Sequence, residues 1–172
     1  MNPWHTVERL SESHDVSRFT CGDDGLNAWL EKSALATQAE GGCGVHLCLG
    51  EDGSVLGFFA LSMTSLQSSE LPTAGNRSRL NTPAIVLAKL ALCSALHSTG
   101  ASSLLVLEAL NAAVRTANGA GGSYLILDAP NADRQGFYLR HNFKLISATD
   151  PTRFYMKMSS ARLAVAQAGV SV

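Results

Sequence analysis

The pattern of apolar and polar residues divides the chain into strand-like and helix-like segments. Two apolar runs, GVHLCLG and SVLGFFALS, flank an Asp-Gly turn at residues 51–53, which predicts a β-hairpin. An apolar strand over residues 84–93 then leads through a turn of small residues into a helix. Apolar residues recur along that helix at helical spacing, and the predicted stripe comprises Leu104, Leu107, Leu110, Val114 and Ala117.

Further segments of the same two kinds lie on both sides of this strand and helix. A strand is expected near residues 4–10, and Asp23 or Asp24 is expected to open a helix by accepting hydrogen bonds from its free amides. A strand at 123–129, a helix at about 131–141 and a final pair of strands, FKLISA and RFYMKMS, follow. These elements predict an α/β protein with one mixed sheet.

The 172 residues, 46% of them hydrophobic, can bury one compact core. No repeat or domain linker interrupts the pattern, and residues 71–83 are expected to form a polar loop. We therefore expect a single domain over residues 1–160. Residues 161–172 are rich in small side chains, so we expect a mobile tail or a marginal helix there.

The turn at residues 97–102, HSTGAS, separates the apolar strand from the long helix. Such a turn attracts phosphate, because its free amides and the helix dipole both favour negative charge. It lacks the lysine of a GxxxxGK[ST] loop, and Gly100 is its one glycine where a dinucleotide fingerprint needs three. The turn predicts a site for a phosphorylated cofactor, or a helix capped by Ser102 or Ser103 without any ligand.

The same turn resembles the [QR]xxGx[GA] loop of the Gcn5-related N-acetyltransferases, which follows a strand and precedes a helix. His97 stands where that family has Gln or Arg, and Ser102 where it has Gly or Ala. Downstream at the expected distance, NADRQGFYLRHNF at residues 131–143 resembles the family pattern NxxAxxFYxxxGF. Asn131, Phe137, Tyr138 and Phe143 are in place, Arg134 replaces Ala, and Asn142, which tolerates left-handed backbone angles, replaces Gly.

A third segment, HDVSRFTCGDDGLNAWL at residues 14–30, resembles the opening of acetyltransferase toxins from toxin–antitoxin modules. VLGFFALS at residues 55–62 also resembles the family's second core hairpin strand and KLAL at 89–92 its cofactor strand, so the likeness extends over nearly the whole chain. These resemblances imply an α/β (α+β mixed) acyl-CoA N-acyltransferase fold, with a central, mostly antiparallel sheet that splays at the cofactor strand and carries flanking helices. They also imply acetyl-CoA as the acetyl donor, aminoacyl-tRNA as the acceptor, a ribbon-helix-helix antitoxin as a partner, and a homodimer.

The resemblance also implies roles for individual residues. The backbone groups of Leu90 and Leu92 would pair with pantetheine as an added strand would. Tyr138 would hydrogen-bond or protonate the departing thiolate, and the alternative is a packing tyrosine on an amphipathic helix. The full set implied for cofactor binding is Leu90, Leu92, His97, Ser98, Thr99, Gly100, Ala101, Ser102, Ser103, Asn131 and Phe137.

Cysteine spacing predicts reduced thiols rather than disulfides or a metal site. The four cysteines form no CxxC pair and no cluster with histidine at metal spacing. The N-terminus lacks an apolar signal core, and the longest apolar run, interrupted by Lys89, is too short to span a bilayer. We therefore expect a soluble cytoplasmic protein with no metal and no membrane anchor.

Charge is unevenly distributed along the chain although its net value is -1. Residues 1–70 carry three Lys or Arg against ten Asp or Glu, and residues 71–172 carry ten against four. If these halves are separate in space, the basic half suits a phosphate-rich partner and the acidic half a basic protein. The candidate RNA contacts are Arg77, Arg79, Arg140, Lys144, Arg153 and Lys157, and Arg134 is a candidate for the diphosphate.

The pKa of the acceptor amine narrows the choice of substrate. An α-amine with a pKa of about 8 is appreciably neutral at pH 7, whereas a lysine amine at about 10.4 needs a base to remove its proton. Neither Glu108 nor Asp128 stands out as that base, which favours an α-amine such as that of aminoacyl-tRNA. Two alternatives stay open: a stand-alone acetyltransferase for a small amine or a protein N-terminus, and a non-catalytic module that binds acetyl-CoA or another protein.

Overall fold

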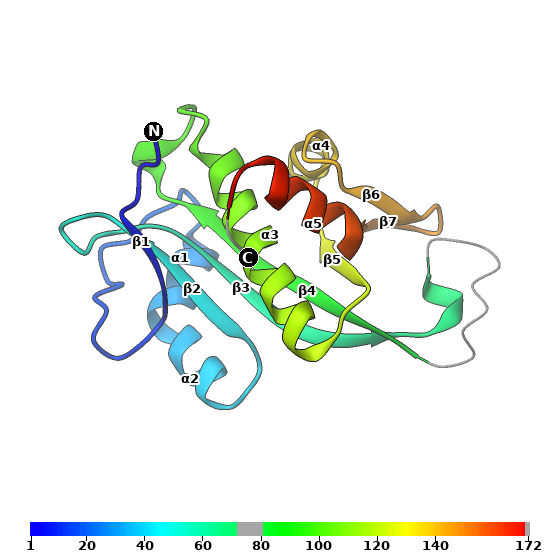
Figure 1. Ribbon diagram of the computed structural model, residues 1–172. Helices are drawn as coiled ribbons and strands as arrows, with labels where there is room; N and C mark the ends of the chain where they lie inside the picture. Colours follow the sequence, from blue (N-terminus) through cyan, green and yellow to red (C-terminus); the bar gives the residue numbers. More distant parts are fainter. Residues whose placement is uncertain (72–80, 171–172) are drawn as a thin grey trace. The chain divides into compact units, whose positions relative to one another are not determined.

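The computed structural model describes residues 1–71 and 81–170, which form strands and helices (Figure 1). The strands are β1 (Thr6–Arg9), β2 (Gly44–Leu49), β3 (Val55–Leu66), β4 (Thr82–Leu92), β5 (Tyr124–Asp128), β6 (Lys144–Ser147) and β7 (Asp150–Lys157). The helices are α1 (Asp24–Lys32), α2 (Ala34–Ala39), α3 (Ala101–Ala120), α4 (Ala132–Arg140) and α5 (Met158–Gln167), with short 3₁₀ turns η1 (Ser68–Glu70) and η2 (Ser94–Leu96). Each element predicted from the sequence is present, and most of the predicted polar loop lies outside the described residues.

The seven strands form one sheet in the order β1-β2-β3-β4-β5-β7-β6. Neighbours pair antiparallel at β1/β2, β2/β3, β5/β7 and β6/β7, whereas β4 and β5 pair in parallel. A parallel pair needs a crossover connection, and α3 supplies it between these two strands. The predicted mixed, mostly antiparallel sheet with helices is confirmed.

The chain forms two compact units. Unit 1 comprises Met1–Ser62 and Ala88–Val106, and unit 2 comprises Met63–Leu87 and Leu107–Val172. The three points of division lie within β3, β4 and α3 rather than at linkers. The expected single domain stays a prediction.

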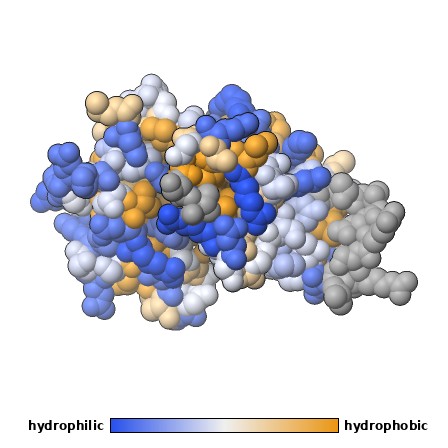
Figure 2. All heavy atoms as spheres, in the orientation of Figure 1, coloured by the Kyte–Doolittle hydropathy of each residue, from blue (hydrophilic) through white to orange (hydrophobic). Residues whose placement is uncertain are grey.

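The surface mixes polar and apolar residues. Hydrophilic and hydrophobic residues are interspersed on the face shown in Figure 2, and Leu139 and Leu163 are more than half exposed, at 54% and 59%. Scattered exposed apolar residues are normal for a folded protein. Among the described helices, none is long and apolar enough to cross a membrane.

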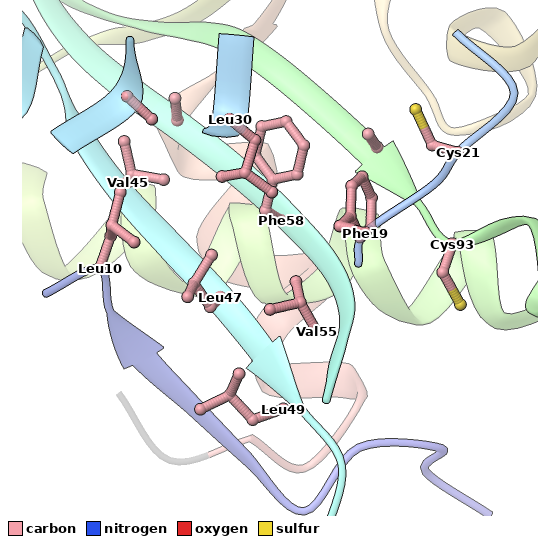
Figure 3. Close-up of a cluster of buried hydrophobic side chains, with 13 residues drawn as sticks. Leu10, Phe19, Cys21, Leu30, Val45, Leu47, Leu49, Val55, Phe58 and Cys93 are labelled. Atoms are coloured by element: carbon pink, nitrogen blue, oxygen red, sulfur yellow. The ribbon is translucent and has the colours of Figure 1, made fainter. Parts of the chain in front are cut away.

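The core of unit 1 packs α1 and the segment before it against β2 and β3 (Figure 3). The fully buried Phe58 contacts the ring of Phe19 edge-on at 5.4 Å and stacks on Trp29 at 6.0 Å between ring centroids. Aromatic pairs of this kind stabilise beyond the area that they bury. Asp23 begins α1 as one of the two predicted caps, because its carboxylate accepts from the Leu26 amide at 3.0 Å.

In unit 2 the C-terminal segment is a helix. Residues 158–167 form α5, so the helical alternative holds for 161–167, and residues 171–172 lie outside the described residues. Met158, Ala161 and Val165 are buried at helical spacing. Arg162 of α5 also donates to Asn118 Oδ1 of α3 at 3.3 Å. Buried apolar side chains and the bond from Arg162 therefore hold this helix in unit 2.

The buried stripe of α3 differs from the predicted one at its N-terminal end. Three predicted positions are buried, namely Leu110, Val114 and Ala117. Leu104 and Leu107 are only half-buried, and Leu105 and Val106 are buried in their place. Four consecutive apolar residues occupy positions 104–107, so hydrophobicity alone does not indicate which of them face the core.

Candidate functional site

Within residues 1–71 and 81–170, the C-terminal half of β4 has no strand partner on its β5 side. The parallel register joins residues 84–86 of β4 to residues 124–126 of β5 and extends no further among the described residues. Beyond it Ala88 is exposed, and Lys89 and Leu90 are half-buried. An unpaired strand edge can accept an added strand or an extended ligand. The predicted pairing of the Leu90 and Leu92 backbones with pantetheine needs such an edge.

The loop that follows β4 in unit 1 holds a tight backbone conformation. Ser98 has φ 64° and Gly100 has φ 86°, both in the left-handed region. The Thr99 hydroxyl donates to the Leu96 carbonyl at 2.7 Å and accepts from the Ala101 amide at 3.3 Å. These bonds fix the turn before α3 begins, and α3 has no acidic residue in its first turn.

Three loop amides, those of Ser98, Gly100 and Ser102, make no hydrogen bond within the described part of the chain. The other amides of the turn are engaged, because Thr99 donates to Leu96, Ala101 to the Thr99 hydroxyl and Ser103 to Gly100. Free amides at the start of a 20-residue helix form an anion cradle. The loop therefore fits a diphosphate, but through alternate amides rather than all of those from 98 to 103.

His97 is tied to the strand rather than left free in the loop. Its Nε2 donates to the Leu92 carbonyl at 3.0 Å, and this nitrogen carries the proton because a carbonyl oxygen only accepts. The bond connects the loop to the end of β4. It uses one of the two lone pairs of the Leu92 carbonyl, so the other stays available for the predicted pairing with pantetheine.

In unit 2, α4 carries the segment that resembles the second acetyltransferase motif. Asn131 caps the helix by accepting from the Arg134 amide at 3.0 Å. Asn142 ends the turn after the helix with φ 65°, the left-handed conformation that the sequence allows there. The ring centroids of Phe137 and His141 lie 4.4 Å apart. The Nδ1 of His141 also donates a hydrogen bond to the Phe137 carbonyl at 2.8 Å. The motif thus explains the shape of α4, and a cofactor role for Asn131 and Phe137 stays a prediction.

Tyr138 of α4 is half-buried between two aromatic rings, those of Phe137 at 5.1 Å and Phe143 at 5.5 Å between centroids. Burial raises the pKa of its phenol to about 12, against the opposing effect of the Arg134 cation one turn earlier. Its hydroxyl makes no hydrogen bond to any described residue. The phenol is therefore protonated at neutral pH and has a donor available for a ligand.

The segment 14–30 that resembles the toxins builds unit 1 rather than a reactive site. His14 Nε2 lies 3.2 Å from the Glu8 carboxylate, and Asp15 accepts from the amide and hydroxyl of Ser17. Phe19 and the other apolar residues of the segment enter the core. The residues that this segment shares with the toxins thus form turns, a helix cap and part of the core.

Sequence reasoning missed one feature of unit 1, a cation over an aromatic ring. Lys89 of β4 holds its Nζ 5.4 Å from the centroid of the Trp29 ring. Such a contact stabilises by about 0.5–1 kcal/mol at an exposed site. In the sequence Lys89 only interrupts an apolar run. The alternation of residues along one strand does not indicate that Lys89 contacts Trp29 of α1.

Asp128 and Arg153 engage each other in unit 2. Arg153 donates from Nε at 3.1 Å and from Nη2 at 3.3 Å to the two carboxylate oxygens of Asp128. Asp128 is therefore used in an ion pair, which agrees with its rejection as a base. Arg153 is the weaker RNA candidate for the same reason. Arg140, Lys144 and Lys157 are exposed, and Arg77 and Arg79 lie outside the described residues.

The charge asymmetry of the sequence is kept by the compact units. By sequence, unit 1 carries four Lys or Arg against nine Asp or Glu, and unit 2 carries nine against five. The basic residues are thus concentrated in one compact unit. No group of three or more His, Cys, Asp or Glu in the described chain could hold a metal ion. The four cysteines are free thiols, and three of them are buried: Cys21, Cys48 and Cys93.

The chain is similar to known proteins over nearly its whole length. No family model matches it. A curated protein of Mycobacterium tuberculosis (strain ATCC 25618 / H37Rv), the "tRNA-acetylating toxin", is 30% identical over 163 residues, which cover 94% of this chain and 97% of that protein.

Two solved structures share the fold. A tyrosine-to-phenylalanine mutant of the toxin AtaT, bound to the C-terminus of the antitoxin AtaR and acetyl-CoA, has a TM-score of 0.78 at 22% identity and covers 94% of this chain and 98% of its own. AtaT complexed with acetyl-methionyl-tRNAfMet has a TM-score of 0.82 at 22% identity and covers 92% and 97%. The fold and the match to the mycobacterial protein together show that this chain belongs to the tRNA-acetylating toxins, within the Gcn5-related N-acetyltransferases.

Proposed function

We propose that the chain transfers the acetyl group of acetyl-CoA to the α-amino group of an aminoacyl-tRNA and thereby blocks translation. Membership of the tRNA-acetylating toxins is the single observation that carries this proposal. The free amides of Ser98, Gly100 and Ser102 support it, since they fit the diphosphate of the acetyl donor. The relative AtaT binds acetyl-CoA in one structure and an acetylated aminoacyl-tRNA in another.

In the reaction the neutral α-amine attacks the acetyl carbonyl carbon of the thioester. The N–C bond forms, the C–S bond breaks, the nitrogen loses one proton and the sulfur gains one. We assign Tyr138 to the departing sulfur. Its pKa of about 12 lies well above the value of about 8.5 typical of a thiol. The phenol therefore stabilises the thiolate by donating a hydrogen bond, and complete proton transfer from it is unfavourable.

The acceptor needs no carboxylate base, because an α-amine is appreciably neutral at pH 7. This agrees with the ion pair that engages Asp128. By the same argument a lysine side chain is a poor acceptor, since its amine is almost fully protonated. The chemistry thus favours aminoacyl-tRNA over protein lysines.

The direct test is incubation of the protein with acetyl-CoA and a pool of charged tRNAs, followed by identification of the aminoacyl ends that gain an acetyl group. The proposal expects one or a few tRNA species to be modified, with release of one free thiol for each acetyl group transferred. If thiol release occurs with a small amine or a peptide N-terminus and with no charged tRNA, the stand-alone acetyltransferase replaces the proposal. Binding of acetyl-CoA without thiol release would leave the non-catalytic module.

We further propose that a ribbon-helix-helix antitoxin neutralises this chain, that two copies form the active homodimer, and that both act in the cytoplasm. The antitoxin is supported by AtaT, which binds AtaR. Unit 1 has an excess of acidic residues, which would attract a basic segment of the antitoxin. Co-expression with the neighbouring reading frame, followed by size-exclusion chromatography with light scattering, measures both assemblies.

A further inference from the structure

Unit 2 contains a surface pocket where β6, β7 and the start of α5 meet. It is lined by Asn142, Lys144, Tyr155, Met156, Lys157 and Ser160. Lys144 lies directly opposite Tyr155 in the β6/β7 register. Because side chains alternate along a strand, Lys157 projects from the same face as Tyr155. The two ammonium groups thus come from adjacent strands to one pocket.

The two lysines are not neutralised by the described part of the chain. Neither side chain forms an ion pair or a hydrogen bond there, and no residue that lines the pocket is acidic. Arg153 shares the face of Lys157 on β7, but the carboxylate of Asp128 engages it. Lys144 and Lys157 are diagonal neighbours on this face, because the residue opposite Lys144 is Tyr155, and their like charges repel each other. An anion bound between them would reduce this repulsion.

We propose that this Lys144–Lys157 pocket binds one phosphodiester group of an RNA backbone. The proposal rests on the proposed action on aminoacyl-tRNA, whose phosphates are the anions that the substrate brings. Besides its two cations the pocket is lined by three residues with neutral donors, Asn142, Tyr155 and Ser160. Its place in unit 2, where basic residues outnumber acidic ones, favours approach of a polyanion.

The test measures tRNA binding against salt concentration for the wild type, Lys144→Gln, Lys157→Gln and the double variant. Each phosphate contact contributes about 0.7–0.9 to the slope of log K against log salt. If both lysines hold the same phosphate, the double variant loses about 0.7–0.9 of slope in total. Two separate contacts would give a loss of about 1.4–1.8 and overturn the single-phosphate pocket. An unchanged slope overturns RNA binding there altogether.

Matched controls separate the pocket from net charge and from folding. Lys32→Gln removes the same charge from an exposed position in α1 of unit 1 and is expected to keep the wild-type slope. A double Lys144→Arg, Lys157→Arg variant keeps both charges and is expected to keep most of the slope. Circular dichroism melting confirms that each variant is folded, as expected for two exposed side chains.

Two further measurements identify which phosphate group the pocket binds. The affinities of the double variant for acetyl-CoA and for dephospho-acetyl-CoA are expected to equal those of the wild type. A loss confined to acetyl-CoA would assign the pocket to the 3′-phosphate of the coenzyme and overturn the RNA proposal. Acetylation of charged tRNA by the wild type is measured in parallel. If the wild type acetylates tRNA while the double variant keeps its slope, only the pocket proposal fails; if the wild type neither binds nor acetylates tRNA, both proposals fail.

Discussion

Ser98 and Asn142 are the two described residues other than glycine with left-handed backbone angles. One lies in the loop before α3 and the other in the turn after α4, the two segments that resemble acetyltransferase motifs. Asn visits this conformation readily, so the sequence allowed it at position 142. Ser rarely does, and strain of about 1–3 kcal/mol persists only where the surroundings or a function hold it. Ser98 lies in the same turn as the free amides of Gly100 and Ser102, and no local sequence pattern indicates its left-handed conformation.

Replacing Tyr138 with Phe removes one hydroxyl and keeps the ring between Phe137 and Phe143. We expect kcat to fall about 100-fold or more, because a donor to the developing charge on sulfur is lost. Acetyl-CoA affinity and melting temperature are expected to stay near the wild-type values, since the hydroxyl bonds to no described residue. Thiol-release kinetics and calorimetry measure the two effects. Turnover at the wild-type rate would remove Tyr138 from the mechanism.

The raised pKa of Tyr138 predicts the shape of the pH profile. Its phenol stays protonated until pH approaches about 12, so it contributes no fall in rate below about pH 11. The rate is expected to rise with pH through the pKa of the α-amine, about 8, as the nucleophile loses its proton. An amide-linked aminoacyl analogue avoids ester hydrolysis at high pH. A fall in rate between pH 8 and 10 that Tyr138→Phe abolishes would contradict the assigned pKa.

At the scale of elements, sequence patterns located the strands and helices but not their tertiary partners. The Asp-Gly turn predicted the β2/β3 hairpin, and Asp23 predicted the start of α1, because both signals act within a few residues. The bond between His97 and the Leu92 carbonyl and the contact between Lys89 and Trp29 join separate elements, so no local pattern reports them. The sequence likewise did not show that only alternate amides of the 98–103 turn are free.

Gly100→Ala tests whether the left-handed turn serves the acetyl donor. Apart from the chain neighbours, no atom of the described residues lies within 4 Å of the added methyl group, so the cost is that of a left-handed backbone, about 1–2 kcal/mol of stability. Gly53→Ala is the matched control, because Gly53 has φ 80° and equally open surroundings in the hairpin turn. We expect both variants to lose similar stability in urea titrations and only Gly100→Ala to lose acetyl-CoA affinity. Equal affinities in the two variants would exclude this loop from the site.

Asn131→Ala separates helix capping from cofactor binding. Loss of the cap on α4 is expected to cost about 1 kcal/mol of stability. Asp23→Ala removes a side-chain cap of the same length, 3.0 Å, from α1 and serves as the control. If Asn131 also binds the acetyl donor, its variant loses acetyl-CoA affinity beyond that of Asp23→Ala. Calorimetric titration of both variants at one temperature gives the comparison.

For the molecule as a whole, charge is divided between two compact units of opposite balance. Composition alone left open whether the acidic and basic parts of the sequence are separate in space, because sequence halves need not be compact. The acidic excess lies within one compact unit and the basic excess within the other, although each unit is assembled from two stretches of chain. A nucleic acid and a basic protein partner can therefore be attracted to different units of one chain.

Binding of acetyl-CoA is expected to stabilise the whole chain by mass action. At a free concentration 100 times its Kd, the ligand raises the free energy of unfolding by about 2.7 kcal/mol. Differential scanning fluorimetry over a range of acetyl-CoA concentrations measures the corresponding rise in melting temperature. A melting temperature that does not change at saturating acetyl-CoA would show that the folded chain does not bind it.

The unpaired half of β4 has a consequence for the protein before it meets its ligand. Bare main-chain donors and acceptors along a strand invite any other extended backbone, including that of a neighbouring molecule. If the acetyl donor pairs with this edge as predicted, the protein without acetyl-CoA is the form most prone to self-association, and binding of the donor shields the edge.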